Sequence, residues 1–233
     1  MHNSPPDSNP QKMPYDAAIY RNRISLTHFI NAYYQVRDCL LYNPKNVLIV
    51  GVGTGLEPVI FRERFGLKVT TLDIDPGFNP DCIRSVHDLG GFLAGQFDVA
   101  VVSHVLEHLP FGYFETALKE LARVSIHSVI YLPYGGRHIE LRLSYAQRAR
   151  EWALNANIPP MKRISGSDYV LQNGEHCWEC GYPGFSIRRI KRILQKFFSV
   201  DGAYHNKDWR YSYNFRLTSR QHIGIKDSFI PRA

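Results

Sequence analysis

Three closely spaced glycines and one acid further along the chain are the residues of this sequence that most clearly indicate chemistry. The segment Asn46–Gly55 reads NVLIVGVGTG, and a second apolar run, Val69–Leu72, ends at Asp73. Glycines that follow a buried strand let the backbone come close to a ligand. An acid at the tip of the next strand is placed to bind both hydroxyls of a ribose. Together these residues predict a nucleoside pocket.

The spacing of the glycines indicates the kind of nucleoside. Gly51, Gly53 and Gly55 form Gly-x-Gly-x-Gly, whereas a dinucleotide-binding turn has Gly-x-Gly-x-x-Gly and a phosphate loop ends in Gly-Lys-Ser/Thr. At this point the sequence resembles the class I S-adenosylmethionine-dependent methyltransferases, in the branch that acts on small molecules. Their first motif is a strand followed by Gly-x-Gly-x-Gly, and their second is a strand that ends in an acid.

The resemblance continues over residues 45–135 with order and spacing intact. Asp88 and Leu89 match the third element, where a carboxylate binds the adenine amino group and a neighbouring backbone N–H reaches a ring nitrogen. The segment 103–110, SHVLEHLP, is similar to the fourth element. The resemblance implies S-adenosylmethionine as cofactor and a set of cofactor-binding residues: Gly51, Val52, Gly53, Gly55, Asp73, Ile74, Asp88, Leu89, Ser103 and His104.

One position departs from the family pattern. Ile49 stands where the family usually has an acid that helps to hold the amino group of the cofactor's methionine. We expect another group to take this role, for instance from residues 15–23. Two of the acids also have simpler interpretations, because Asp73 could be a turn or N-cap residue and Asp88 could cap the next helix.

The candidate catalytic residues are His108, with Glu107 as a possible orienting group, and His176. For a hydroxyl acceptor the protein must align the nucleophile and remove its proton, and histidine suits that task because its reference pKa is about 6.5. The alternative is that Glu107 and His108 are structural or cofactor-side residues.

The segment 176–180, HCWEC, suggests a metal site, but structural zinc usually needs four ligands and no second Cys pair exists in the sequence. We therefore predict no metal. The segment is interpreted as an acceptor-side loop, with Trp178 as an aromatic platform beside His176 and Glu179. In the alternative interpretation Trp178 packs on the core.

Continuous apolar strands alternate with amphipathic helices, which predicts a parallel sheet covered on both faces. With the resemblance, the predicted fold is α/β: a Rossmann-like, doubly wound, mostly parallel seven-stranded sheet with a C-terminal antiparallel hairpin. We expect a disordered tail at 1–14 and a single methyltransferase domain at 15–233. Within it, an acceptor-side insertion is expected at about 137–183, containing a helix over Glu140–Asn155.

Composition limits the class of protein. A chain of 233 residues with 44% hydrophobic residues suits one globular domain. It contains no apolar run of membrane-spanning length, its first residues lack a signal-peptide pattern, and its four cysteines suit a reducing compartment. These features predict a cytoplasmic protein.

The positive charge is concentrated at the C-terminus. Residues 181–233 hold eleven Lys/Arg and three Asp/Glu, a net charge of +8, whereas the first 180 residues have a net charge of −1. This segment indicates either a surface for nucleic acid or anionic lipid or the solvated face of a helix over Phe185–Ser199.

Three functions follow from these observations. The leading one is transfer of a methyl group from S-adenosylmethionine to oxygen on a small-molecule or carbohydrate-like acceptor. The second is a nucleic-acid (RNA) methyltransferase that uses the basic C-terminal quarter. The third is a non-catalytic cofactor-binding scaffold protein, to which the missing acid at Ile49 gives some weight.

Overall fold

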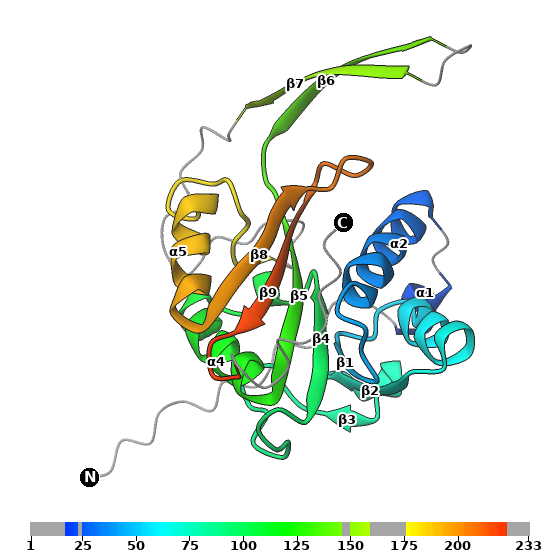
Figure 1. The fold of residues 1–233 in the computed structure, drawn as a ribbon, viewed down its shortest axis with the longest axis vertical. Helices are drawn as coiled ribbons and strands as arrows, with labels where there is room; N and C mark the ends of the chain where they lie inside the picture. The colour runs from blue at the N-terminus through cyan, green and yellow to red at the C-terminus, as the bar shows by residue number, and fades with distance from the viewer. Residues whose placement is uncertain (1–16, 23–24, 146–149, 159–175, 223–233) are drawn as a thin grey trace.

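A computed structural model describes residues 17–22, 25–145, 150–158 and 176–222 of the chain. Its centre is a seven-stranded sheet with the strand order β3-β2-β1-β4-β5-β9-β8 (Figure 1). The strands are β1 Asn46–Val50, β2 Lys68–Asp73, β3 Cys82–Ile83, β4 Phe97–Ser103, β5 Ser125–Pro133, β8 Phe198–His205 and β9 Ser212–Ser219. Strands β3, β2, β1, β4 and β5 are parallel, and β9 is antiparallel to both of its neighbours. This confirms the predicted fold class, including the C-terminal hairpin.

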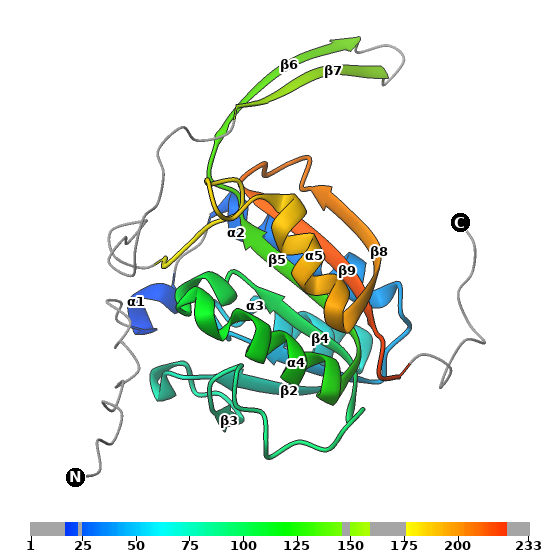
Figure 2. The same cartoon turned by 90° about the vertical axis from the view of Figure 1, so that its left-hand side faces the viewer.

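Helices cover both faces of the sheet (Figure 2). The helix α2 lies on one face, and α4 and α5 lie on the other. The α-helices are α1 Ala17–Arg21, α2 Leu26–Leu40, α3 Leu56–Val59, α4 Phe114–Val124 and α5 Ile187–Phe197. Short helical turns complete the set: η1 Ile60–Arg64, a π-helical continuation of α3, and the 3₁₀ turns η2 Pro76–Phe78, η3 Leu106–His108 and η4 Phe111–Tyr113.

Two apolar clusters hold these layers together, and alternate residues of each strand belong to one or the other. In β1, Leu48 and Val50 pack in the cluster that includes α4 and α5, whereas Val47 and Ile49 pack in the cluster that includes α2. A strand that is buried on both faces needs apolar side chains at every position. This requirement explains the unbroken apolar runs in the sequence.

The basic helix α5 presents its charges to solvent. Ser186 caps its first turn by accepting a hydrogen bond from the backbone N–H of Arg189. Ile190, Ile193 and Leu194 are buried against the sheet, while the Lys and Arg side chains between them are exposed. The structure therefore supports the interpretation of this segment as the solvated face of a packed helix.

Beyond the end of β5, a two-stranded antiparallel hairpin extends away from the main sheet (Figures 1 and 2). It consists of β6 Arg137–Tyr145 and β7 Arg150–Ile158. The predicted helix over Glu140–Asn155 is therefore wrong. Ile139, Leu141 and Leu143 recur every second residue, which is the period of a strand.

The hairpin lies in the part of the chain that was predicted as an insertion at 137–183. The rest of that insertion, 159–175, and the expected tail at 1–14 lie outside the described residues, so the domain boundaries stay a prediction. Within the described residues, no helix is long and apolar enough to cross a membrane.

Candidate functional site

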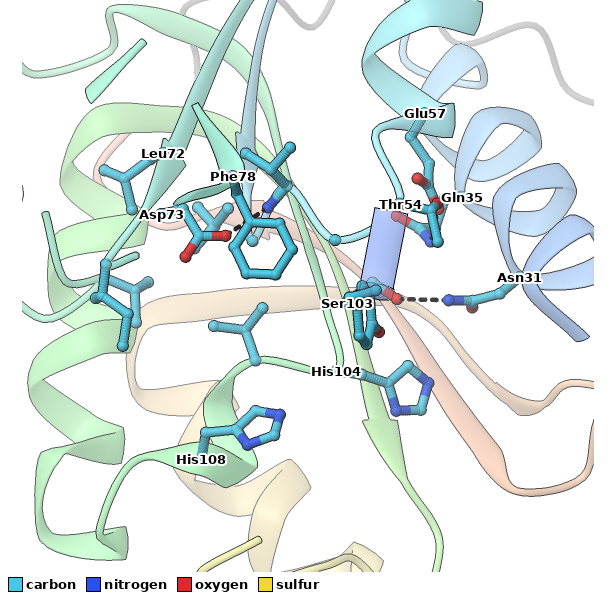
Figure 3. A pocket seen from close by; sticks show the side chains of 18 of the residues that line it. Asn31, Gln35, Thr54, Glu57, Leu72, Asp73, Phe78, Ser103, His104 and His108 are labelled. Carbon is cyan, nitrogen blue, oxygen red and sulfur yellow. Dashed lines mark hydrogen bonds between the residues drawn. The ribbon is translucent and has the colours of Figure 1, made fainter. Parts of the chain in front are cut away.

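A cavity of about 230 Å³ lies at the carboxyl ends of β1, β2 and β4, next to the loops that follow them (Figure 3). This edge of a parallel sheet is where ligands of doubly wound folds bind. The following residues of the predicted cofactor set line it: Gly51, Val52, Gly53, Asp73, Ile74, Ser103 and His104. The described wall of the cavity does not include Gly55, Asp88 or Leu89.

The glycine loop after β1 has a conformation that side chains would disturb. Gly51 has a φ of +82°, and a Cβ atom added there would lie 2.5 Å from Cγ2 of Val105. Its N–H donates a hydrogen bond to the carbonyl of Leu72 at 2.8 Å. Gly53 and Gly55 also have positive φ, and Gly55 is the N-cap residue of α3. Gly51 and Gly53 therefore form a part of the cavity wall that has no side chains, whereas Gly55 begins α3.

Asp73, at the end of β2, is held by the backbone. Its Oδ2 accepts a hydrogen bond from the N–H of Val52 at 2.8 Å, and its Oδ1 accepts one from the N–H of Asp75 at 3.0 Å. Burial raises the pKa of this carboxyl, and the backbone hydrogen bonds reverse only part of the effect. Each carboxylate oxygen keeps acceptor capacity for one more donor. The group is thus oriented to accept hydrogen bonds from a diol.

A second polar wall faces Asp73 across the cavity, and the sequence did not reveal it (Figure 3). Gln35 donates a hydrogen bond from Nε2 to Oε1 of Glu57 at 2.7 Å, and Asn31 donates one from Nδ2 to Oγ of Ser103 at 3.0 Å. Burial raises the pKa of Glu57, and its hydrogen bonds offset part of that shift.

The cavity wall contains an acid, Glu57, whereas position 49 holds an apolar core residue. Ile49 is 3% exposed and packs in the cluster with α2, so its side chain belongs to the core. Glu57 lies two residues after Gly55, at the first turn of α3, and lines the same cavity. The signal that could have found it is its place directly after the glycine motif. From the segment 15–23, Tyr20 also lines the cavity.

The end of the cavity beyond Asp73 is apolar, with Leu72, Phe78 and Val86 in its wall. Asp88 is turned away to solvent, with 67% of its side chain exposed and a contact of 3.7 Å to Arg84. The N–H of Leu89 donates to Oε2 of Glu120 at 3.2 Å. The structure therefore does not bring Asp88 and Leu89 into the cavity with the other predicted residues. Ser85 and Arg84 line the cavity there.

At the other side, a buried carboxylate is surrounded by histidines. Glu107 of η3 is fully buried. Its Oε1 lies 3.5 Å from Nδ1 of His104 and 3.9 Å from Nε2 of His176. Burial raises the pKa of Glu107, but His104, His108 and His176 outweigh this effect and the pKa is lower than usual. The three histidines around Glu107 therefore favour the charged form of its carboxyl group.

His108 and His176, which are 68 residues apart in sequence, lie in contact. Their ring centroids are 4.9 Å apart in an edge-to-face arrangement. His108 lines the cavity, and Glu107 and His176 lie behind its wall. The structure thus brings the three predicted catalytic residues together, although only one of them faces the cavity.

His104, before η3, has a left-handed backbone conformation with a φ of +53°. This conformation is uncommon for a residue with a side chain and is often found at functional sites. The His104 ring lies 5.0 Å from that of Trp209, which also lines the cavity. Trp209 comes from the β8–β9 connection, which sequence reasoning did not associate with the site.

The segment 176–180 is fixed against the end of the sheet. The N–H of Cys177 donates to the carbonyl of Glu107 at 2.8 Å, and the N–H of Cys180 donates to the carbonyl of Pro133 at 2.9 Å. Trp178 is fully buried, packs against Phe111 and donates from Nε1 to a backbone carbonyl at 3.1 Å. The interpretation of Trp178 as an exposed platform is therefore wrong, because its ring belongs to the core.

Comparisons with known proteins agree with this geometry. Residues 48–130 match the sequence model of a family described as "Methyltransferase domain". The chain contains a class I methyltransferase domain. S-adenosylmethionine is the methyl donor of this class, and the recognition from sequence is confirmed.

Solved structures share the fold at low sequence identity. The protein PH0226 from Pyrococcus horikoshii OT3 has a TM-score of 0.55 at 12% identity, over 85% of this chain and 93% of that one. A putative O-methyltransferase from Nostoc punctiforme PCC 73102 has a TM-score of 0.54 at 10% identity, over 83% of this chain and 58% of that one. Magnesium protoporphyrin IX methyltransferase from Synechocystis PCC 6803, solved with bound SAM, has a TM-score of 0.50 at 14% identity, over 82% of this chain and 78% of that one. A search of curated protein sequences finds no match.

The cavity of this methyltransferase domain fits S-adenosylmethionine. Asp73 is oriented for a ribose diol, the apolar end at Phe78 suits a flat base, and Glu57 with Gln35 faces the other end of the cavity. A ligand that carries a base, a ribose and an ammonium group along its length matches these three regions in order.

Proposed function

We propose that this methyltransferase transfers the methyl group of S-adenosylmethionine to an oxygen atom of a small-molecule or carbohydrate-like acceptor. The observation that carries the proposal is the group of histidine and tryptophan rings in one part of the cavity wall. His104 and His108 line the wall there, with Trp209 next to His104. A hydroxyl acceptor needs hydrogen-bond partners and a route for its proton, and these side chains provide them.

The chemistry sets what the residues must do. S-adenosylmethionine supplies an electrophilic methyl group on a sulfonium. The acceptor oxygen forms a bond to the methyl carbon while the carbon–sulfur bond breaks and its electron pair stays on sulfur. The hydroxyl proton passes to a ring nitrogen of His108, whose side chain lines the cavity, and the imidazole becomes an imidazolium. Positioning the two reactants is the main contribution of the protein.

Within this proposal the cofactor contacts are divided among three groups. Asp73 binds the ribose hydroxyls, the apolar wall at Leu72 and Phe78 receives the adenine, and Glu57 receives the amino group of the methionine. Asp88 has no part in this arrangement, since its side chain points to solvent.

The acceptor class follows from the walls of this end of the site. His104 and His108 contribute polar rings to this part of the wall, and Trp209 contributes an aromatic ring next to His104. Aromatic faces together with hydrogen-bonding side chains suit a sugar ring or a phenol. A polymer such as RNA receives no specific support, because the charged residues of α5 are the solvated face of an ordinary packed helix.

The test has a binding step and a turnover step. Calorimetry with S-adenosylhomocysteine should show one saturable site. Incubation with S-adenosylmethionine and a panel of sugar nucleotides, polyols and phenols, followed by mass spectrometry, should show a product heavier by one methylene group. Binding without any methylated product in the panel would contradict the acceptor class, and no binding at all would leave only the scaffold interpretation.

A further inference from the structure

We propose that Glu107, His108 and His176 form a binding site for a divalent transition-metal ion at the acceptor end of the cavity. One ligand atom from each of the three side chains lies within 4.8 Å of the other two. Two imidazole nitrogens and one carboxylate oxygen form a donor set that suits zinc, manganese, iron or cobalt better than magnesium or calcium. No sequence motif predicts this site, because its ligands come from two segments that are far apart in the sequence, η3 and residues 176–180.

The state of Glu107 is the first argument for an ion. The Glu107 side chain is fully buried. Within the described residues, neither of its carboxylate oxygens has a hydrogen-bond partner. The approaches of His104 and His176 to Oε1, at 3.5 and 3.9 Å, are longer than hydrogen bonds. A buried carboxylate without hydrogen bonds is costly, and a cation bound between Oε1 and the two imidazoles would satisfy it.

The orientation of His176 is the second and independent argument. Its Nδ1 lies 2.8 Å from Oε1 of Glu179, which is itself buried, so its Nε2 is the nitrogen that faces Glu107. The hydroxyl of Tyr211 donates to the same Glu179 oxygen at 2.8 Å. A carboxylate that fixes the far nitrogen of a histidine is the usual support of a metal-binding imidazole.

The backbone holds the two parts of the site together. The N–H of Cys177 bonds to the carbonyl of Glu107 at 2.8 Å, which ties the segment that carries His176 to η3. Metal bonds of about 2.0–2.2 Å require ligand atoms roughly 3–3.6 Å apart, so the side chains need to close by about an ångström.

An ion in this place would act on the acceptor. His108 lines the cavity, so the open coordination positions of the ion would face the space where the acceptor binds. A bound cation lowers the pKa of a coordinated hydroxyl and orients it. This second step rests on the proposed O-methyl transfer, whereas the metal site itself does not. The substrate class then narrows to acceptors with a hydroxyl that can coordinate a metal, such as a diol or a catechol.

The experiment uses the full chain, without an affinity tag, after treatment with a chelator. Titration with Co²⁺ should give one equivalent of binding and the visible absorption of cobalt in a nitrogen–oxygen site, and calorimetry with Zn²⁺ should give the same stoichiometry. Glu107→Gln and His176→Ala should each lose this binding. Glu179→Gln should weaken it by roughly 10–100-fold, as expected for a residue that orients a ligand.

The matched control is His127→Gln. His127 lies on β5 and bonds through Nδ1 to the hydroxyl of Thr218, away from the cluster, so this variant should bind Co²⁺ like the wild type. Every variant is also titrated with S-adenosylhomocysteine, and unchanged affinity shows that its fold is intact. For any variant that fails this check, competition of Zn²⁺ with Co²⁺ on the wild type decides the stoichiometry.

Two results would overturn the site. The first is a wild-type protein that binds S-adenosylhomocysteine but takes up no stoichiometric Co²⁺ or Zn²⁺. The second is an intense near-ultraviolet charge-transfer band from thiolate to cobalt, which would assign the ion to Cys177 and Cys180. Neither result touches the proposed methyl transfer, which is tested by the acceptor panel.

Discussion

At the scale of single residues, Asp73 is the side chain whose role is best defined by geometry. Backbone N–H groups fix both of its oxygens at the rim of the cavity. Asp73→Asn should weaken S-adenosylhomocysteine binding by about 1–3 kcal/mol, or roughly 5–150-fold, because a charge-assisted hydrogen bond is lost. Calorimetry measures the change. The control is Asp75→Asn, since Asp75 only caps η2, and equal affinities of the two variants would contradict the ribose contact.

Substitution of Glu57 should change stability and cofactor affinity in opposite directions. Its pKa is raised by burial from the usual value of 4.5, so ionisation costs stability in the cofactor-free protein at pH values above the raised pKa. The cost disappears as the pH falls below 4.5, where both the folded and the unfolded states are protonated. Glu57→Gln should therefore be more stable than the wild type at about pH 8, with a difference that shrinks as the pH falls.

The same substitution should weaken cofactor binding, since the amide cannot pair with an ammonium group. Urea unfolding across pH measures the first effect, and calorimetry with S-adenosylmethionine measures the second. Glu63→Gln is the control, because Glu63 is an exposed acid of the following turn. A Glu57→Gln variant that binds the cofactor as tightly as the wild type would remove Glu57 from the site.

These two acids show what the sequence can and cannot predict about a site. The place of Asp73 in the cavity wall was predictable because it depends on a local pattern, a strand that ends beside a glycine turn. Asn31, Gln35 and Trp209 were not, because they reach the cavity from a helix and a hairpin whose packing no local pattern encodes. The position of Asp88 outside the cavity wall was not predictable either, since its orientation depends on Arg84 and on the loop around it.

At the scale of elements, the strands were predicted closely because burial on both faces leaves an unbroken apolar run. The hairpin β6–β7 was not, because its charged residues also allow a helical pattern. The alternation of Ile139, Leu141 and Leu143 was the signal for strands. Ile139 and Leu141 are more than half exposed, so these two side chains gain little stability from burial.

The hairpin can be shortened without touching the sheet. Glu140 pairs with Asn155, so joining them through an Asn-Gly turn keeps the pairs nearer to the domain. We expect this variant to bind S-adenosylhomocysteine like the wild type and to lose turnover, because the hairpin belongs to the predicted acceptor side. Calorimetry and the methylation assay separate the two readouts. Full turnover on the acceptor would show that the outer part of the hairpin plays no role in the reaction.

At the scale of the whole molecule, the positive charge is concentrated in the C-terminal part of the chain. The net charge of +8 in residues 181–233 contrasts with −1 in the rest of the chain. Part of it lies on the exposed face of α5, whose buried side packs on the sheet through Ile190 and Leu194. A helix that packs this way needs polar residues on its outer face for solubility, and that need alone accounts for the charges.

Reversal of these charges distinguishes the two acceptor classes. The triple variant Arg188→Glu, Lys191→Glu and Arg192→Glu should keep its turnover on a small acceptor, because these side chains point to solvent. If RNA were the substrate, the variant would lose three phosphate contacts, and its affinity would depend less steeply on salt. In a plot of log K against log salt concentration, each lost contact in a duplex reduces the slope by about 0.9. Titration of tRNA at several salt concentrations measures that slope.

A control with the same change of charge on other exposed cations, Lys45, Arg64 and Lys68, accounts for the general effect of net charge. A steep wild-type slope that only the α5 variant loses would reassign the protein to nucleic acid, whereas weak binding in all three proteins supports a small acceptor.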